Sequence, residues 1–155
     1  MKMLKIVALT LAGALPLLPA MATAQDDGDD GVTMIGFSKS LFFGLEGDAI
    51  EFTVTKEGPA EVQIYWATAS SANSHTGSDA EPGKDFVASR GSLFFFGEDT
   101  EKTFTVQTIA DGDDTEVAEV VMVGLAINPL ADIQGGSVEL NPFKWQAVGL
   151  IHPGF

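Results

Sequence analysis

A dense run of carboxylates lies between two strand-like stretches of the chain. From Asp111 to Glu119 the sequence reads DGDDTEVAE, so five acidic side chains fall within nine positions. Such closely spaced negative charges repel one another unless something neutralises them. Because hard cations take several oxygen ligands, this run could form one wall of a calcium site. The alternative is a solvated acidic turn, and its position in the fold must decide between the two.

The run does not form a calcium site of the EF-hand type. In a twelve-residue loop starting at Asp111, the sixth position is Glu116 where the turn needs glycine, and the twelfth is Met122 where a glutamate is needed. A calcium ion would therefore have to be held by oxygens from separate loops.

The sequence gives little evidence of catalytic side chains. His75 lies in a polar loop and His152 close to the end of the sequence, and neither has the partner that a catalytic triad requires. Paired carboxylates could serve a glycosidase, which keeps a hydrolase as a minor alternative. A domain of this size looks too small to form a substrate cleft beside its core, so we expect a protein that is not an enzyme.

Composition narrows the range of partners. The chain has 155 residues with 22 acidic and 8 basic side chains, for a formal net charge of -14. This charge opposes binding to nucleic acid and to anionic lipid. Cysteine is absent, which excludes disulfides, a thiolate nucleophile and a zinc–thiolate site.

The sequence predicts three regions. Residues 1–24 combine a charged start, an apolar run and a small-x-small cleavage sequence, which is typical of a secretory signal peptide. Residues 25–32 are acidic and poor in apolar side chains, and we expect a disordered leader. Residues 33–155 form one domain and contain no apolar segment long enough to span a bilayer. We expect an exported protein, in the periplasm, on the cell surface or outside the cell, without membrane insertion.

Strand-like alternation positions the acidic side chains. Ile50, Phe52 and Val54 alternate with polar residues, and the same period recurs along the chain. About seven strands without an amphipathic helix predict an all-β antiparallel sandwich. The alternating stretches are a broken strand over 34–43, then 50–55, 62–66, 93–95, 103–107, 121–125 and 145–151, with Trp66 in the core.

The connections between these strands are also predicted. Lys56 to Pro59 reads as a turn, and Thr68 to Gly83 as a long polar loop without a regular period. Because the ends of a sandwich collect loops that are distant in sequence, residues around Glu46, Asp85 and Asp111 could converge at one end.

Several segments, in order, resemble the Calx-β domain family over roughly Phe37 to Ile151. No single segment is specific, but their order and spacing are. The similar segments are LEGD followed by IEFTVTK at 45–56, GKDF at 83–86, GSLFF and GEDTEKTFTV at 91–106, IAD at 109–111, E-x-x-E at 116–119 and V-x-V-x-L at 121–125.

The resemblance implies an immunoglobulin-like β-sandwich with calcium bound at one end. The acidic residues that match the family's ligands and their supports are Glu46, Asp85, Asp111, Glu116 and Glu119, with Asp113 as an addition. The chain departs from the family pattern where Gly112 replaces a second aspartate and where the last strand ends without a run of aspartates. These departures predict that at least one of the family's cation positions is absent.

Two functions follow from the sequence. In the first, Ca²⁺ orders acidic loops at one end of the sandwich, and these loops present a surface to another extracellular protein or to a second copy. In the second, the domain is a metal-independent structural or adhesive module of the cell surface.

Overall fold

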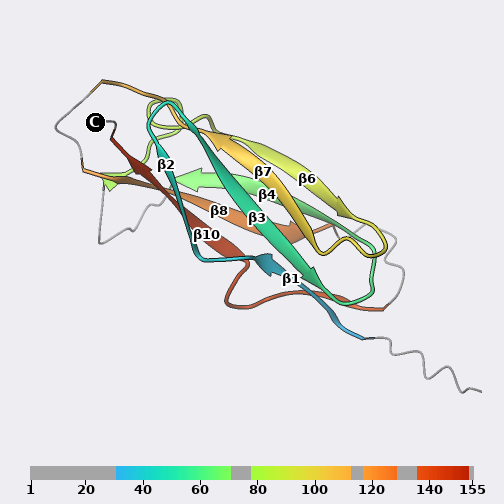
Figure 1. The fold of residues 1–155 in the computed structure, drawn as a ribbon. Coiled ribbons are helices and arrows are strands. Elements are labelled where there is room, and N and C mark those ends of the chain that lie inside the picture. The colour runs from blue at the N-terminus through green and yellow to red at the C-terminus, as the bar shows by residue number, and fades with distance from the viewer. Residues whose placement is uncertain (1–30, 71–77, 113–116, 129–135, 154–155) are drawn as a thin grey trace, which may run out of the picture.

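The computed structural model describes residues 31–70, 78–112, 117–128 and 136–153. These residues form strands and connections without any helix, and therefore include no helix long and apolar enough to cross a membrane. The strands form two sheets that pack face to face, as Figure 1 shows. The predicted all-β sandwich is confirmed.

The smaller sheet has four strands. Its order across the sheet is β7 (Glu101–Gln107), β3 (Ala49–Glu57), β1 (Thr33–Phe37) and β9 (Val138–Leu140). Strand β3 pairs antiparallel with both β7 and β1, whereas β1 and β9 are parallel.

The larger sheet has six strands. Strand β8 pairs antiparallel with β4 and β10, while β2 joins β10 in parallel and the two-residue β5 joins β8 in parallel. The order is β2 (Leu41–Leu45), β10 (Gln146–His152), β8 (Glu119–Ile127), β4 (Val62–Ser70) and β6 (Arg90–Phe95), with β5 (Ser78–Asp79) beside β8.

The predicted count of about seven strands was too low. The described part of the chain has ten strands, of which nine are longer than two residues. The loop expected from Thr68 to Gly83 was wrong at its ends, because β4 continues to Ser70 and β5 forms at Ser78–Asp79. Pairing with β8 supplies the backbone partners that make these polar residues extended. Residues 71–77 lie outside the described part.

The core lies between the sheets and is rich in aromatic rings. On β3, Ile50, Phe52 and Val54 are fully buried, as their alternation predicts. Phe104 of β7 stacks on Phe52 at a centroid distance of 5.4 Å and on Trp66 at 4.0 Å. Trp66 is half-buried and packs against the core, so the aromatic contacts join the two sheets.

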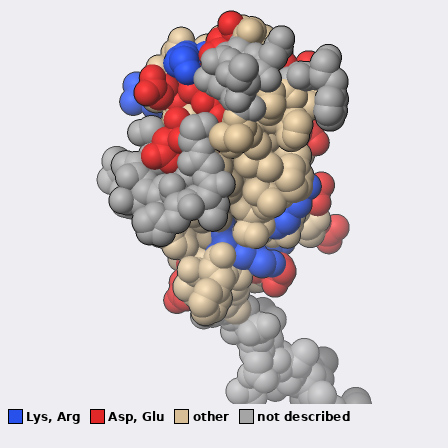
Figure 2. All heavy atoms as spheres, turned by 90° about the vertical axis from the view of Figure 1, so that its left-hand side faces the viewer, with Lys and Arg blue, Asp and Glu red and all other residues tan. Residues whose placement is uncertain are grey.

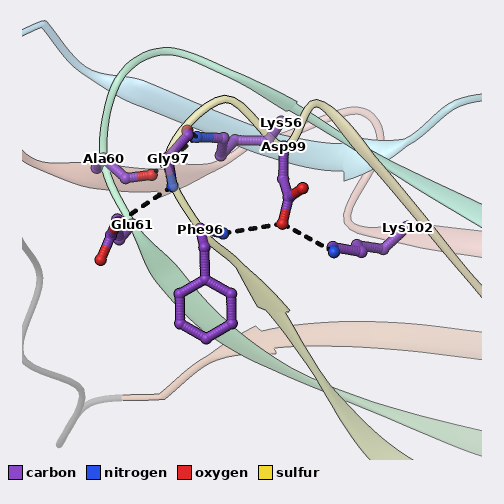
Figure 3. A network of polar contacts seen from close by, with 7 residues as sticks. All are labelled: Lys56, Ala60, Glu61, Phe96, Gly97, Asp99 and Lys102. Carbon is purple, nitrogen blue, oxygen red and sulfur yellow. Dashed lines mark hydrogen bonds and ion pairs between the residues drawn. The ribbon is translucent and has the colours of Figure 1, made fainter.

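A buried lysine closes one end of this core. The turn predicted from Lys56 to Pro59 was wrong in its first half, since β3 continues through Lys56 and Glu57 and the chain bends at Gly58 and Pro59. The Lys56 side chain is 3 % exposed and follows the inward positions of β3. Its ammonium donates to the carbonyl oxygens of Ala60 at 3.1 Å and Gly97 at 2.8 Å, as Figure 3 shows. Two backbone carbonyls thus replace part of the water that this charge loses.

Two carboxylates bind the backbone of the connection between β6 and β7, beside Lys56. Glu61 accepts a hydrogen bond from the backbone N–H of Gly97 at 3.1 Å. Asp99 accepts one from the N–H of Phe96 at 3.1 Å and pairs with Lys102 at 2.8 Å (Figure 3). The hydrogen bond from Lys102 and that from Phe96 lower the pKa of Asp99 below its ordinary value. The ion pair of Asp99 with Lys102 therefore stabilises the fold at pH values above the ordinary pKa of an aspartate. This stabilisation is lost as the pH falls through the lowered pKa that Asp99 has in the folded protein.

Replacing Lys56 by methionine should destabilise the fold. The carbonyl of Ala60 would lose a buried donor, which costs about 1–3 kcal/mol. Urea unfolding measures this change in the free energy of unfolding. The control, Lys102→Met, removes a half-exposed lysine from the same region and should have a much smaller effect. Equal effects of the two substitutions would contradict the role assigned to Lys56.

Candidate functional site

Three connections meet at the other end of the sandwich, around Thr108. The Thr108 hydroxyl lies 2.8 Å from the carbonyl oxygen of Leu45 and 2.7 Å from that of Asp48, at the two sides of the β2–β3 turn. The backbone N–H of Thr108 donates to the same Asp48 carbonyl at 3.0 Å. This buried residue therefore fastens the segment after β7 to the β2–β3 turn, at the left-hand end of Figure 1.

The segment between β5 and β6 is fastened to the same place. Phe86 forms a β-bridge with Thr108, and the N–H of Ile109 donates to the carbonyl of Asp85 at 2.8 Å. Gly83 turns this segment with φ of 84°, a left-handed conformation that glycine adopts without steric cost. The chain around Asp85 thus lies beside the chain that leads to Asp111.

The buried carboxylate of Asp85 stabilises the turn that begins at Glu81. Its side chain is 3 % exposed, and one of its oxygens accepts a hydrogen bond from the N–H of Glu81 at 2.6 Å. The N–H of Asp85 in turn donates to the carbonyl of Glu81 at 3.0 Å. These two bonds close the turn, while the other carboxylate oxygen lies 3.6 Å from the ammonium of Lys84.

Lys84 places a positive charge between two acidic residues. Its ammonium is 3.6 Å from Asp85 Oδ1 and 3.6 Å from Asp111 Oδ2. The Lys84 side chain is half-exposed; of its two partners, Asp85 is buried and Asp111, with a 22 % exposed side chain, is reached by solvent. No role was predicted for Lys84, although its place directly before Asp85 was the available signal.

Glu46 and Glu119 lie at the same end of the molecule. The backbone N–H of Glu46 donates to the carbonyl of His152, the last residue of β10, at 3.0 Å. Glu119 is the first residue of β8, is 4 % exposed, and pairs in register with Ile151 of β10. Figure 2 looks onto this end and shows Asp and Glu side chains gathered on one part of it beside Lys or Arg.

The structure thus brings four of the six predicted residues to one end of the sandwich, from separate connections. Asp113 and Glu116 lie outside the described residues and stay predictions. Among the residues that are described, no three acidic, histidine or cysteine side chains are grouped closely enough to hold a metal ion. The four described carboxylates therefore share an end of the fold without forming a coordinating set by themselves.

Comparisons with known proteins show with which structures this chain shares its fold. No family model matches the sequence, and no curated protein matches it. Among solved structures, the apo form of the Calx CBD1 domain superposes with a TM-score of 0.62 at 20% identity, covering 79% of this chain and 98% of that domain. The two chains share one fold. A second match, the calcium-binding domain CBD12 of CALX1.1, has a TM-score of 0.57 at 22% identity. It covers 78% of this chain, which spans 44% of the CBD12 chain.

Proposed function

We propose that this protein binds calcium at the end of the sandwich that carries Glu46, Asp85, Asp111 and Glu119. The observation that supports the proposal most is that carboxylates from separate connections meet at one end of the sandwich. Carboxylates so arranged favour a cation, and oxygens from several loops suit the flexible coordination of Ca²⁺. The fold shared with CBD12 of CALX1.1, which is described as a calcium-binding domain, adds support.

Asp113 and Glu116 complete the proposed ligand set. The four described carboxylates need further oxygens, and these two residues belong to the acidic run between Asp111 and Glu119. Calcium would then hold this run against the end of the sandwich. The ordered connections would present a surface to an extracellular partner, so the role is binding and not catalysis, in a protein exported from the cell.

Lys84 sets the strength of this binding. Its ammonium already neutralises part of the charge on Asp85 and Asp111, and a calcium ion between these carboxylates would have to displace it. Displacement costs free energy, so the affinity should be lower than six carboxylates alone would give.

The second candidate is a structural or adhesive module without a metal. It is favoured by the same lysine and by Asp85, whose carboxylate already closes its own turn. In this case the acidic end is a surface neutralised by its own lysine.

Calcium should stabilise the folded protein. For residues 25–155, calcium at tenfold above its Kd should add about 1.4 kcal/mol to the free energy of unfolding, because it binds the folded form alone. Thermal melts with calcium and with chelator measure this gain. Asp111→Asn should reduce it, whereas Asp99→Asn, the same change at the opposite end, should not. Equal melting temperatures in calcium and in chelator would contradict calcium binding and would support the metal-independent module.

Removing the Lys84 ammonium should strengthen calcium binding. Lys84→Met removes a competing charge that is half-exposed, so we expect a gain of about three- to tenfold in affinity, or roughly 1 kcal/mol. Calorimetric titration compares it with Lys144→Met, which makes the same charge change before β10, away from the acidic end. Weaker binding by Lys84→Met than by Lys144→Met would show that Lys84 supports the site instead of competing with calcium.

A further inference from the structure

The outer faces of the two sheets differ in kind. On the four-stranded sheet, most positions that point away from the core carry polar side chains, as is usual where one face of an antiparallel sheet meets water; Met34 and Ala49 are the exceptions among the described residues. Registered pairs such as Glu51 with Thr105 and Thr53 with Thr103 show this on β3 and β7. This face needs no partner.

The outer face of the six-stranded sheet is apolar across its strands. Leu41 of β2, Val148 of β10 and Met122 of β8 lie in one registered row, and Phe43 and Leu150 begin the next. Phe43 is 65% exposed although it lies within a strand. We call this surface the apolar face; its apolar outward residues are Leu41, Phe43, Leu45, Met122, Ala126, Val148, Leu150, Tyr65, Ala67, Ala69, Phe94 and the buried Val120. Gln63, Ser92 and Gln146 are polar positions within it.

The apolar face combines a ridge with a hollow. The ridge is made by Phe43 and its neighbours on the edge strand β2. Towards β6 the surface sinks into a hollow of about 740 Å³. Its floor has small residues, among them Ala67, Ala126 and Gly124, and Tyr65, Trp66 and Arg90 also line it. A Cβ added at Gly124 would meet no atom within 4 Å, so small side chains leave this space open. A surface that carries both a ridge and a hollow can fit a copy of itself.

Charge also favours a second copy at this face. The chain has a net charge of -14, so two copies repel one another wherever carboxylates meet. The outward positions of β2, β10, β8, β4 and β6 carry no Asp or Glu, and the basic groups among them are Arg90 and His152. Asp79 of β5, paired with Val120, stands at the margin. Two copies can therefore approach here with the least repulsion.

The area is sufficient for a modest interface. Five strands spaced about 4.8 Å apart, covered over about 20 Å of their length, present on the order of 500 Å² of projected area. Side chains that rise above the sheet bring the accessible area towards the roughly 600–800 Å² per partner of specific interfaces.

We propose that the apolar face docks on the same face of a second copy, around a two-fold axis near β8, the central strand. Such a contact is isologous, so the ridge of each copy lies over the hollow of the other. The contact reaches the acidic end only at its margin, through Leu45 and Val120, and it does not depend on calcium.

Sedimentation equilibrium of residues 25–155, from micromolar to millimolar protein, tests this. We expect a monomer–dimer equilibrium that strengthens with salt, because salt screens the repulsion between acidic chains. Phe43→Asp should weaken association at least tenfold, since it removes a large apolar contact and adds a charge. Thr103→Asp adds the same charge on the outer face of the other sheet and should associate like the wild type.

A second measurement uses the absence of cysteine from the chain. Met122→Cys on the central strand should form an intermolecular disulfide on mild oxidation, whereas Thr103→Cys should not. A monomer at all concentrations overturns the proposal, as does a dimer that Phe43→Asp leaves intact. A dimer that chelator dissolves would place the contact at the acidic end. Capture of the monomer by phosphatidylcholine vesicles would assign the face to lipid.

Discussion

The buried Thr108 determines how the acidic end of this protein is built. Its hydroxyl and N–H reach the carbonyls of Leu45 and Asp48, and it bridges to Phe86 on the other side. A buried backbone carbonyl without a donor is costly, so these bonds keep three connections together. These bonds therefore hold the connections that carry Glu46, Asp85 and Asp111 at the same end of the sandwich.

Bringing acidic side chains together has a cost, and the structure offsets it locally. Asp85 receives a backbone N–H, and Lys84 contributes an ammonium shared with Asp111. The opposite end of the sandwich uses the reverse arrangement, in which the buried charge is Lys56 and backbone carbonyls surround it. Both ends of the core are thus closed by a charge whose lost hydration is replaced by protein groups. At the acidic end, Glu46, Asp85, Asp111 and Glu119 come from separate connections and Lys84 pairs with only two of them, which is why a cation is proposed there.

Strands whose inner and outer faces differ could be predicted from the sequence. On β3 the alternation from Ile50 to Val54 reflects a buried inner face and a polar outer one, and the structure confirms it. Strand β9 could not be predicted, because three residues carry too little periodicity and depend on parallel pairing with β1. The same holds for β5, which has two residues and depends on β8. Lys56 was read as part of a turn because a charge inside a core is unexpected until its carbonyl partners are known.

Part of the candidate site could also be predicted from the sequence, and part could not. That Glu46, Asp85 and Asp111 share one end was predicted from loop order in a sandwich, and the contacts around Thr108 confirm it. The role of Lys84 depends on distances between side chains, which no pattern of residues provides. The apolar face was present in the sequence, since Leu41, Phe43 and Leu45 alternate with Phe42, but alternation alone does not say which of two apolar faces is covered.

Manganese relaxation in nuclear magnetic resonance tests the central claim most directly, because Mn²⁺ accepts the oxygen ligands that calcium uses. In residues 25–155, we predict that sub-stoichiometric Mn²⁺ broadens the amide signals of Glu46, Asp85, Asp111 and Glu119 together, and that excess calcium restores them. Signals of Lys56 and Gly97, at the other end, should stay sharp. Broadening confined to the acidic leader, or spread evenly over the protein, would contradict a cation site at this end.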